Sequence, residues 1–193
     1  WTLLVPNTKG GASMSSVAES DVAMKHADNN YVDIYRQLGQ YWGNQPGTSG
    51  PVYIGAFVCM LFVLGLLIVR GPMKWGLLVA TVLSIMLSWG RNFMPLTDFF
   101  IDYVPMYAKF RTVASILVVA EFTMPLLAML ALKRIADEPD FFANNKKKIY
   151  ISYAVTAGIC VLFALMPSVF FPDFVSNAEM RALSQFPQEH LMP

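Results

Sequence analysis

The chain contains four long apolar runs separated by polar stretches. They cover residues 52–69, 75–89, 112–132 and 149–171, and the one charged residue within them is Glu121. A helix of a soluble domain hides one apolar stripe and does not remain apolar on every side for about 20 residues. The pattern therefore predicts an all-α fold, a polytopic transmembrane helix bundle with four spans in residues 51–171.

The lengths of the runs indicate how each would cross a bilayer. At about 1.5 Å per residue, a hydrocarbon core of about 30 Å requires about 20 residues, so the run at 75–89 is short. Lys74 can extend its ammonium group to the headgroups and thereby make the shorter run sufficient. Gly71 and Pro72 interrupt the helical pattern, which predicts a tight hairpin connection at residues 70–74.

The distribution of lysine and arginine predicts the orientation of the spans. The loop 133–148 and its borders hold the densest cationic set in the chain, and such loops remain in the cytoplasm. Alternation of the spans then places 1–50, the loop 90–111 and 172–193 outside. We expect 172–193 to begin a further extracytoplasmic segment.

Residues 1–50 form a polar segment rich in glycine and serine. Aromatic and aliphatic side chains recur in it at helical spacing, which predicts a short amphipathic helix at about 28–41, lying on the outer surface. Trp42 follows this helix. Its ring either anchors the chain at the membrane interface or stacks on a sugar ring.

The loop 90–111 is the first candidate site, because it combines six aromatic residues with a pair of carboxylates. Thr97 can cap a helix that runs to the residue before Pro105. Asp98 and Asp102 then lie one turn apart, with about 6 Å between them. Such a pair can bind a divalent cation, orient a sugar hydroxyl or include a general base. Alternatively, both carboxylates face water and Asp98 offsets the helix dipole.

Three cations flank this helix, namely Arg91, Lys109 and Arg111. Lysine and arginine are usually enriched in cytoplasmic loops, yet these three lie in a loop predicted to be outside, so they are candidates for a functional role. A guanidinium at the headgroup boundary matches a phosphate with two parallel hydrogen bonds. The set therefore either binds the phosphate of a lipid carrier, or attracts anionic headgroups and pairs with the neighbouring aspartates.

Glu121 lies near the middle of the third run, four residues before Pro125. An acidic side chain at that depth costs about 2.5–3.5 kcal/mol on insertion scales and is rarely left facing lipid. We therefore expect Glu121 to point into the bundle or into a water-filled cavity. It would there be bonded to a neighbouring helix as a protonated acid, or line a cavity beneath the outer loop.

Composition excludes several classes of function. The chain is 55% hydrophobic and 14% charged with a net charge of +1, and it has no basic face for nucleic acid. Cys59 and Cys160 stand alone in apolar runs, without the spacing of a zinc site or a redox pair. The chain begins at Trp1 without a signal sequence and ends in a polar stretch. We expect it to be an internal piece of a longer protein.

Four segments carry a resemblance to a known family. They are Tyr-Trp-Gly-Asn-Gln-Pro at 41–46, Gly-Pro-Val-Tyr-Ile-Gly at 50–55, Leu-Ser-Trp-Gly at 87–90 and Pro-Met-Tyr-Ala-Lys-Phe-Arg at 105–111. In this order they resemble the YfhO family of bacterial membrane proteins, in the form found in Bacteroidota. Members of that family are several times longer and are similar to polytopic glycosyltransferases of the GT-C type.

The resemblance implies an activity and a location. Such enzymes take a sugar from a polyprenyl-phosphate donor and transfer it to a cell-envelope glycan or glycolipid on the outer face of the bacterial cytoplasmic (inner) membrane. The resemblance implies that Lys109, Phe110 and Arg111 face the donor phosphate. The catalytic carboxylate of such enzymes lies in the first outer loop of the whole protein, so the general base is expected outside this chain.

Two other functions remain open. A secondary transporter would also place an acidic residue at mid-membrane, although it usually shows a repeated pair of broken helices, and none is found here. A non-catalytic scaffold or lipid-binding subunit would retain the apolar runs without any requirement for Asp98 and Asp102.

Overall fold

The computed structural model describes residues 2–12, 14–26, 32–42, 52–105, 107–109 and 113–170. The regular elements in these segments are helices, and the β-structure in them is limited to isolated bridges. The all-α prediction is therefore confirmed for the described residues. The chain divides into two compact units, one made mainly of Val52–Leu165 together with Leu3–Val5, and the other of Pro6–Pro51 and Met166–Pro193.

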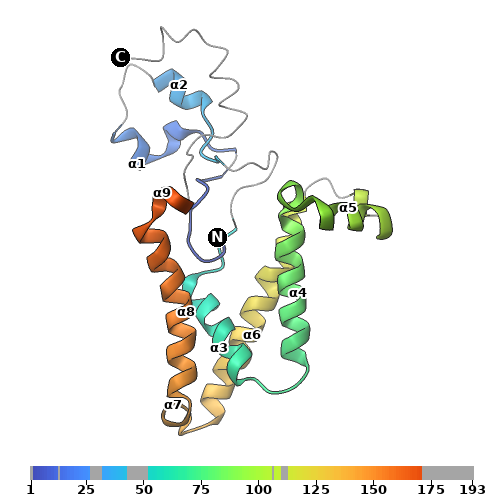
Figure 1. The fold of residues 1–193 in the computed structure, drawn as a ribbon. Helices are drawn as coiled ribbons and strands as arrows, with labels where there is room; N and C mark the ends of the chain where they lie inside the picture. The colour runs from blue at the N-terminus through green and yellow to red at the C-terminus, as the bar shows by residue number, and fades with distance from the viewer. Residues whose placement is uncertain are drawn as a thin grey trace. The chain divides into compact units, whose positions relative to one another are not determined.

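The first unit is built on four main helices, drawn in Figure 1. They are α3 (Ala56–Ile68), α4 (Met73–Ser88), α6 (Leu117–Asp137) and α8 (Lys146–Leu165). Shorter elements connect them, namely η3 (Gly90–Phe93), α5 (Met94–Tyr103), η4 (Tyr107–Lys109), η5 (Val113–Ile116) and α7 (Phe141–Asn144). The second unit contains η1 (Val17–Glu19), α1 (Asp21–Met24), α2 (Val32–Gln37) and α9 (Pro167–Phe170).

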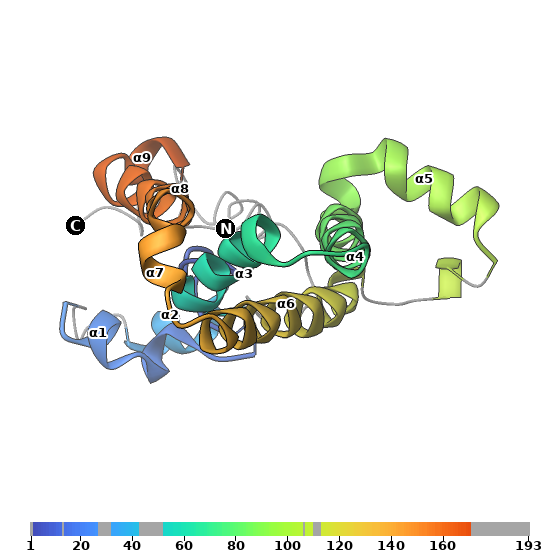
Figure 2. The same ribbon diagram turned by 90° about the horizontal axis from the view of Figure 1, so that it is seen from below.

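The pair α3 and α6 forms the centre of the first unit. In Figure 2, α4 and α8 lie on opposite sides of α3, and α6 packs against both α3 and α4. Gly65 permits the close approach of α3 and α6, because a Cβ atom at this position would lie 2.9 Å from the backbone oxygen of Leu127. Small residues on α6, Ala120 and Ala131, are fully buried. Small side chains at such contacts are typical of helix packing in membranes.

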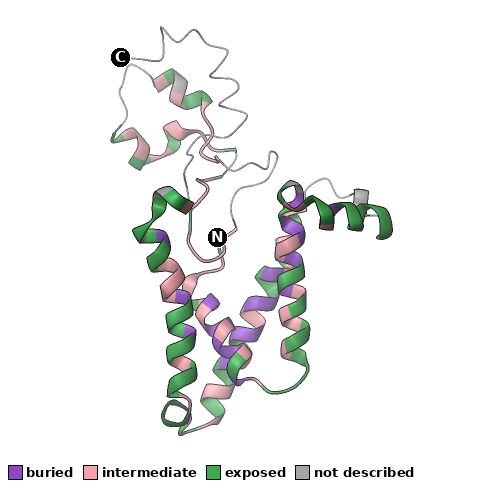
Figure 3. Cartoon of the chain, viewed as in Figure 1, coloured by how far each residue is buried: buried purple, intermediate pink, exposed green. Residues whose placement is uncertain are grey.

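Buried side chains are concentrated in two clusters. One contains Leu61, Leu64, Ile68, Ala128, Ala131 and Phe141, and the other contains Cys59, Phe62, Ala120, Met124 and Leu127. Figure 3 shows buried positions, in purple, where α3, α4 and α6 face one another, whereas most of α8 is exposed. The four helices therefore leave many large apolar side chains exposed after they have packed against one another.

Hydroxyl groups connect the helices inside this apolar interior. The Oγ1 atoms of Thr81 on α4 and Thr123 on α6 are 2.6 Å apart. The hydroxyl of Ser152 on α8 donates to the carbonyl oxygen of Met60 on α3 at 3.2 Å. Interhelical hydroxyl bonds of this kind are common between helices in lipid, where few other polar partners exist.

All four main helices differ in their boundaries from the predicted runs, and for the first and the last the backbone shows the reason. The first helix begins at Ala56 and not at residue 52, because Gly55 adopts a φ of 111°. Its amide and that of Ile54 donate to the carbonyl oxygen of Leu3, at 3.3 and 3.2 Å. The last helix begins at Lys146 and ends at Leu165, short of residue 171, because Pro167 has no N–H group with which to continue it.

Among the described residues, two helices are long and apolar enough to cross a membrane. The first is Ala114–Asp137, with 24 residues, which joins most of η5 to α6. The second is Lys146–Leu165, which is α8 and has 20 residues. The apolar helices α3 and α4 have 13 and 16 residues and are shorter than the usual span. The structure therefore contains two helices of spanning length where the sequence predicts four spans, the second of them short.

The hairpin between α3 and α4 occurs where it was predicted. Gly71 adopts a φ of 109° and separates Ile68 at the end of α3 from Met73 at the start of α4. Lys74 also makes a contact that the sequence did not predict. Its ammonium group donates to the carbonyl oxygen of Leu66 at 3.0 Å and so satisfies one of the last carbonyls of α3.

The connection between α6 and α8 folds back onto the bundle. The cations Lys133 and Arg134 lie in the last turns of α6, and Arg134 forms an ion pair of 3.2 Å with Glu138. In α7, Phe141 is 1% exposed and packs into the cluster of α3 and α6 side chains. The predicted loop 133–148 is thus largely helical and contributes to the core.

In the second unit, residues 9–11 and 15–17 pair with residues 38–42. Bridges join Gly10 to Tyr41 and Ser16 to Gly39. The predicted amphipathic helix at about 28–41 is shorter than expected, since α2 ends at Gln37, before the residues that form these bridges. The first positions of that prediction, and all of 172–193, lie outside the described residues.

Candidate functional site

Helix α5 carries the carboxylate pair predicted from the sequence. The prediction that Thr97 caps this helix is wrong, because the helix begins three residues earlier, at Met94. Thr97 is buried, and its hydroxyl donates to the carbonyl oxygens of Gly90 and Phe93, at 3.0 and 3.2 Å. These bonds fix α5 onto the turn that follows α4. The helix ends at Tyr103, ahead of Pro105, as predicted.

Asp98 and Asp102 lie one turn apart on α5 and are both exposed. Neither forms an ion pair with a described residue. The described part of the chain also holds no group of three or more His, Cys, Asp or Glu side chains that could bind a metal ion. A divalent cation at this pair would therefore need its remaining ligands from a substrate, from water or from another segment.

Aromatic rings cover the rest of α5. Phe99 contacts Phe100 and Tyr103, with ring centroids 5.8 and 5.0 Å apart. Phe100 also contacts Tyr107 of η4, at 5.4 Å between centroids, and this contact joins η4 to α5. Burial raises the pKa of the Tyr107 hydroxyl above its ordinary value.

The three predicted phosphate-binding cations are described unequally. Lys109 ends η4 and is exposed. The backbone of Arg91 lies in η3, but its side chain is outside the described part of the structure, as is the whole of Arg111. Their grouping around a phosphate therefore stays a prediction.

Glu121 does not point into the interior formed by these helices, which corrects the expectation from the sequence. It is exposed on α6, on the same face as Val118 and Phe122. The helical period explains this position, because Glu121 lies about a quarter turn from the centre of the face on which Ala120, Met124 and the other buried residues of α6 lie, at the edge of that face.

Trp42 lies in the second unit and takes part in its bridged pairing. Its amide donates to the carbonyl oxygen of Lys9 at 3.1 Å. Its ring lies against Gly10, where an added Cβ atom would be 2.8 Å from the ring carbon Cε3. One part of the ring is thus used in packing, and the side chain is only partly exposed.

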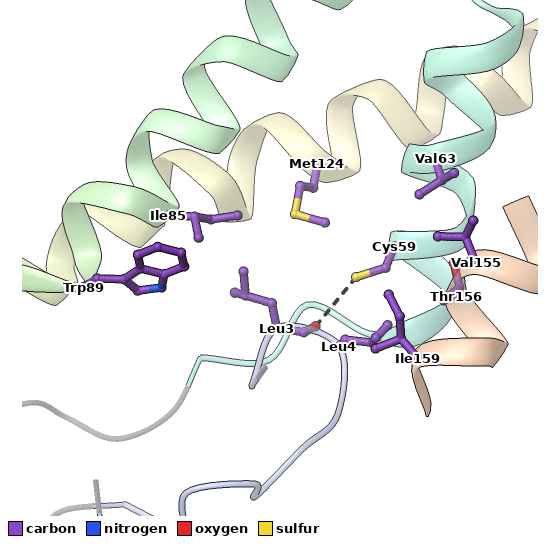
Figure 4. Close-up of a pocket in the computed structure, with 10 residues that line it drawn as sticks. All are labelled: Leu3, Leu4, Cys59, Val63, Ile85, Trp89, Met124, Val155, Thr156 and Ile159. Carbon is purple, nitrogen blue, oxygen red and sulfur yellow. Dashed lines mark hydrogen bonds between the residues drawn. The ribbon is translucent and has the colours of Figure 1, made fainter. Parts of the chain in front are cut away.

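Sequence reasoning missed an apolar cavity of about 410 Å³ in the first unit. Figure 4 shows that its wall combines side chains of α3, α4, α6 and α8 with the short segment before them in the chain. The lining residues are Leu3, Leu4, Cys59, Val63, Ile85, Trp89, Met124, Val155, Thr156 and Ile159. No local signal marks these positions, because each reads as an ordinary apolar residue within its own segment.

The side chains of Cys59 and Thr156 in the lining are both hydrogen-bonded to backbone. The Cys59 thiol donates to the carbonyl oxygen of Leu3 at 3.7 Å, as drawn in Figure 4. The Thr156 hydroxyl donates to the carbonyl oxygen of Ser152 at 3.0 Å. Trp89 marks one end of the cavity, and its ring contacts Phe93 with 6.2 Å between centroids. The cavity therefore reaches the turn from which α5 starts.

The described residues form a helical protein with two helices that are long and apolar enough to cross a membrane. An apolar cavity lies among the helices, and α5 carries two exposed carboxylates. No protein-family model matches the chain, and no match to it was found among the curated proteins or the solved structures. The resemblance to the YfhO family accordingly remains a hypothesis.

Proposed function

We propose that the chain is a membrane-embedded part of a glycosyltransferase that uses a polyprenyl-phosphate-linked sugar on the outer face of the bacterial cytoplasmic membrane. One observation carries the proposal. Trp89 lines the apolar cavity, and α5, which follows Trp89 after one short turn, holds two exposed carboxylates. A lipid-linked sugar donor requires these two environments side by side.

Exposed apolar side chains support the membrane part of the proposal. In the most apolar windows of the two long helices, 33% and 17% of the residues are buried, whereas a core helix of a soluble protein would be mostly buried. Large side chains such as Phe57, Phe122 and Leu162 are exposed. Apolar surface on this scale is typical of contact with lipid or with further protein.

We propose that α3 and α4 cross the bilayer as well, although they are short. The 13 residues of α3 span about 20 Å, and the four non-helical residues before it add up to about 13 Å. Backbone that is not helical is tolerated at membrane depth where its polar groups are bonded within protein. The bonds from Ile54 and Gly55 to Leu3 satisfy that condition for two amides.

In this arrangement α5 lies at the outer interface. Phe99 and Tyr103 are exposed, as suits aromatic side chains at headgroup level. Asp98 and Asp102 would orient sugar hydroxyls, directly or through a divalent cation. Lys109, with Arg91 and Arg111, would offset the charge that develops on the departing phosphate while a carboxylate from outside this chain deprotonates the acceptor.

A lipid-binding subunit without catalysis is the second candidate, and the cavity favours it. Its lining contains no carboxylate, histidine or amine, so it offers binding to a hydrocarbon but no acid or base. The two candidates differ in whether the exposed groups of the loop 90–111 matter for sugar transfer.

The topology can be tested with single cysteines. In a variant whose Cys59 and Cys160 are replaced by alanine, Tyr103→Cys should react with a membrane-impermeant maleimide on intact bacterial cells. Phe142→Cys should react only after lysis, because the cation-rich connection is retained inside. Both positions are exposed in the structure, so access depends on the side of the membrane. Labelling of Phe142→Cys alone on intact cells would invert the arrangement and refute the proposal.

Sugar transfer can be tested through Arg111. In the full-length protein, Arg111→Ala should lower transfer from a polyprenyl-phosphate donor by about 100-fold or more, because a charge that stabilises the leaving phosphate is lost. Arg70→Ala, which removes an exposed cation from the α3–α4 hairpin, is the matched control and should keep its activity. Membrane abundance is measured by immunoblotting for both variants. Equal transfer at equal abundance would leave only the lipid-binding candidate.

A further inference from the structure

We infer that the cavity among α3, α4, α6 and α8 is a binding site for one hydrocarbon chain of a membrane lipid. The inference depends on the membrane part of the proposed function and is independent of sugar transfer. It begins from the cavity itself, which has a volume of about 410 Å³ and is open on one side. This volume is within the range of about 300–1,000 Å³ found for ligand sites.

The chemistry of the lining selects an apolar ligand. Eight of the ten lining residues are leucine, valine, isoleucine, methionine or tryptophan. The hydroxyl of Thr156 and the thiol of Cys59 already donate their protons to backbone carbonyls. A polar ligand would therefore lose its bonds to water with little replacement, whereas a hydrocarbon loses none. A concave apolar surface of this type favours an apolar ligand, because its burial removes apolar area from water on both partners.

The walls of the cavity are firmly placed. Leu3 and Leu4 form one wall, and the carbonyl oxygen of Leu3 accepts bonds from the amides of Ile54 and Gly55 as well as from Cys59. The opposite walls belong to helices that are packed around α3. These hydrogen bonds and helix contacts hold the residues that line the cavity in place within the unit.

The position of Trp89 orients the chain. Because Trp89 lines the cavity and its ring contacts Phe93 in η3, one end of the cavity adjoins the turn before α5. A lipid whose chain fills the cavity would carry its headgroup out beside this turn. The exposed carboxylates of α5 and the exposed Lys109 lie on the elements that follow.

Photocrosslinking tests the inference and identifies the source of the chain. The purified chain in nanodiscs is exposed to phosphatidylglycerol with a diazirine in one acyl chain, and separately to an undecaprenyl phosphate that carries the same group. Peptides modified at Val63, Met124 or Ile159 are expected with one of the two probes, which then names the lipid. Adducts confined to exposed residues such as Val79 or Leu162, with both probes, would overturn the inference.

Cavity-filling substitutions provide an independent test. Val63→Trp and Ile159→Trp each place an indole in the cavity from a different helix and should lower the crosslinked yield at least fivefold. Val79→Trp, the same substitution at an exposed position of α4, should leave the yield unchanged. Circular dichroism and size-exclusion profiles select variants that fold as the parent does. An unchanged yield in either folded filling variant would overturn the assignment, whether or not sugar transfer is later demonstrated.

Discussion

Phe141→Ala should destabilise the first unit by about 3–5 kcal/mol, the range observed when a buried phenylalanine is truncated in a well-packed site. The side chain of Phe141 is 1% exposed and packs among Leu61, Leu64 and Ile68 of α3 and small residues of α6. It is the link through which the α6–α8 connection is attached to the bundle. Its removal leaves a cavity at the contact of three segments.

Phe142→Ala is the matched control for this experiment. The two phenylalanines are adjacent in α7, but Phe142 is 63% exposed. Its truncation should change stability by less than about 0.5 kcal/mol, as is usual for surface substitutions. The measurement is unfolding of the purified chain in mixed micelles with increasing SDS, followed by circular dichroism. Equal midpoints for the two variants would show that Phe141 is not packed as the structure describes.

Gly65→Val should separate α3 from α6 and reduce stability by about 1–3 kcal/mol, the usual cost of overpacking. A Cβ atom at Gly65 would already lie 2.9 Å from both the backbone oxygen and the Cγ atom of Leu127. A backbone oxygen cannot turn aside as a side chain can, so the helices must move apart. The substitution also disturbs the pair of helices that carries Cys59 and Met124 into the cavity.

Gly76→Val separates this steric effect from helix propensity. Gly76 is also inside a helix, but an added Cβ atom there would meet nothing within 4 Å. Both substitutions replace a helical glycine by the same residue, so any difference reflects the contact with Leu127. The same SDS titration reports it, together with the yield of crosslinked lipid. Indistinguishable curves for the two variants would contradict the close approach of α3 and α6.

Much of the candidate site on α5 could be predicted from the sequence. The one-turn spacing of Asp98 and Asp102 and the end of the helix before Pro105 follow from local rules, and the structure contains both. The start of the helix could not be predicted in the same way. Thr97 resembles a cap residue, yet its hydroxyl donates to the carbonyls of Gly90 and Phe93, because α5 is preceded by a 3₁₀ turn.

The direction of Glu121 and the cavity were beyond sequence reasoning. A helix that is apolar on nearly every side has no stripe to indicate which face is buried. Glu121 was therefore predicted to face the interior, because exposing a carboxylate to lipid is costly. In the structure, α6 instead contacts α3 through a face that includes its small residues. The cavity depends on Leu3 and Ile159, which are far apart in the chain.

The sequence by itself determined that the chain is helical, where its apolar segments are, and that a turn at Gly71 follows the first of them, because composition and glycine conformation act over a few residues. Only the tertiary structure decided which faces of α6 are covered, how Thr97 and Lys74 use their polar atoms, and that five separate segments line one apolar cavity that is open on one side. These features depend on close approach between distant residues, such as Gly65 and Leu127, and no local pattern encodes that geometry.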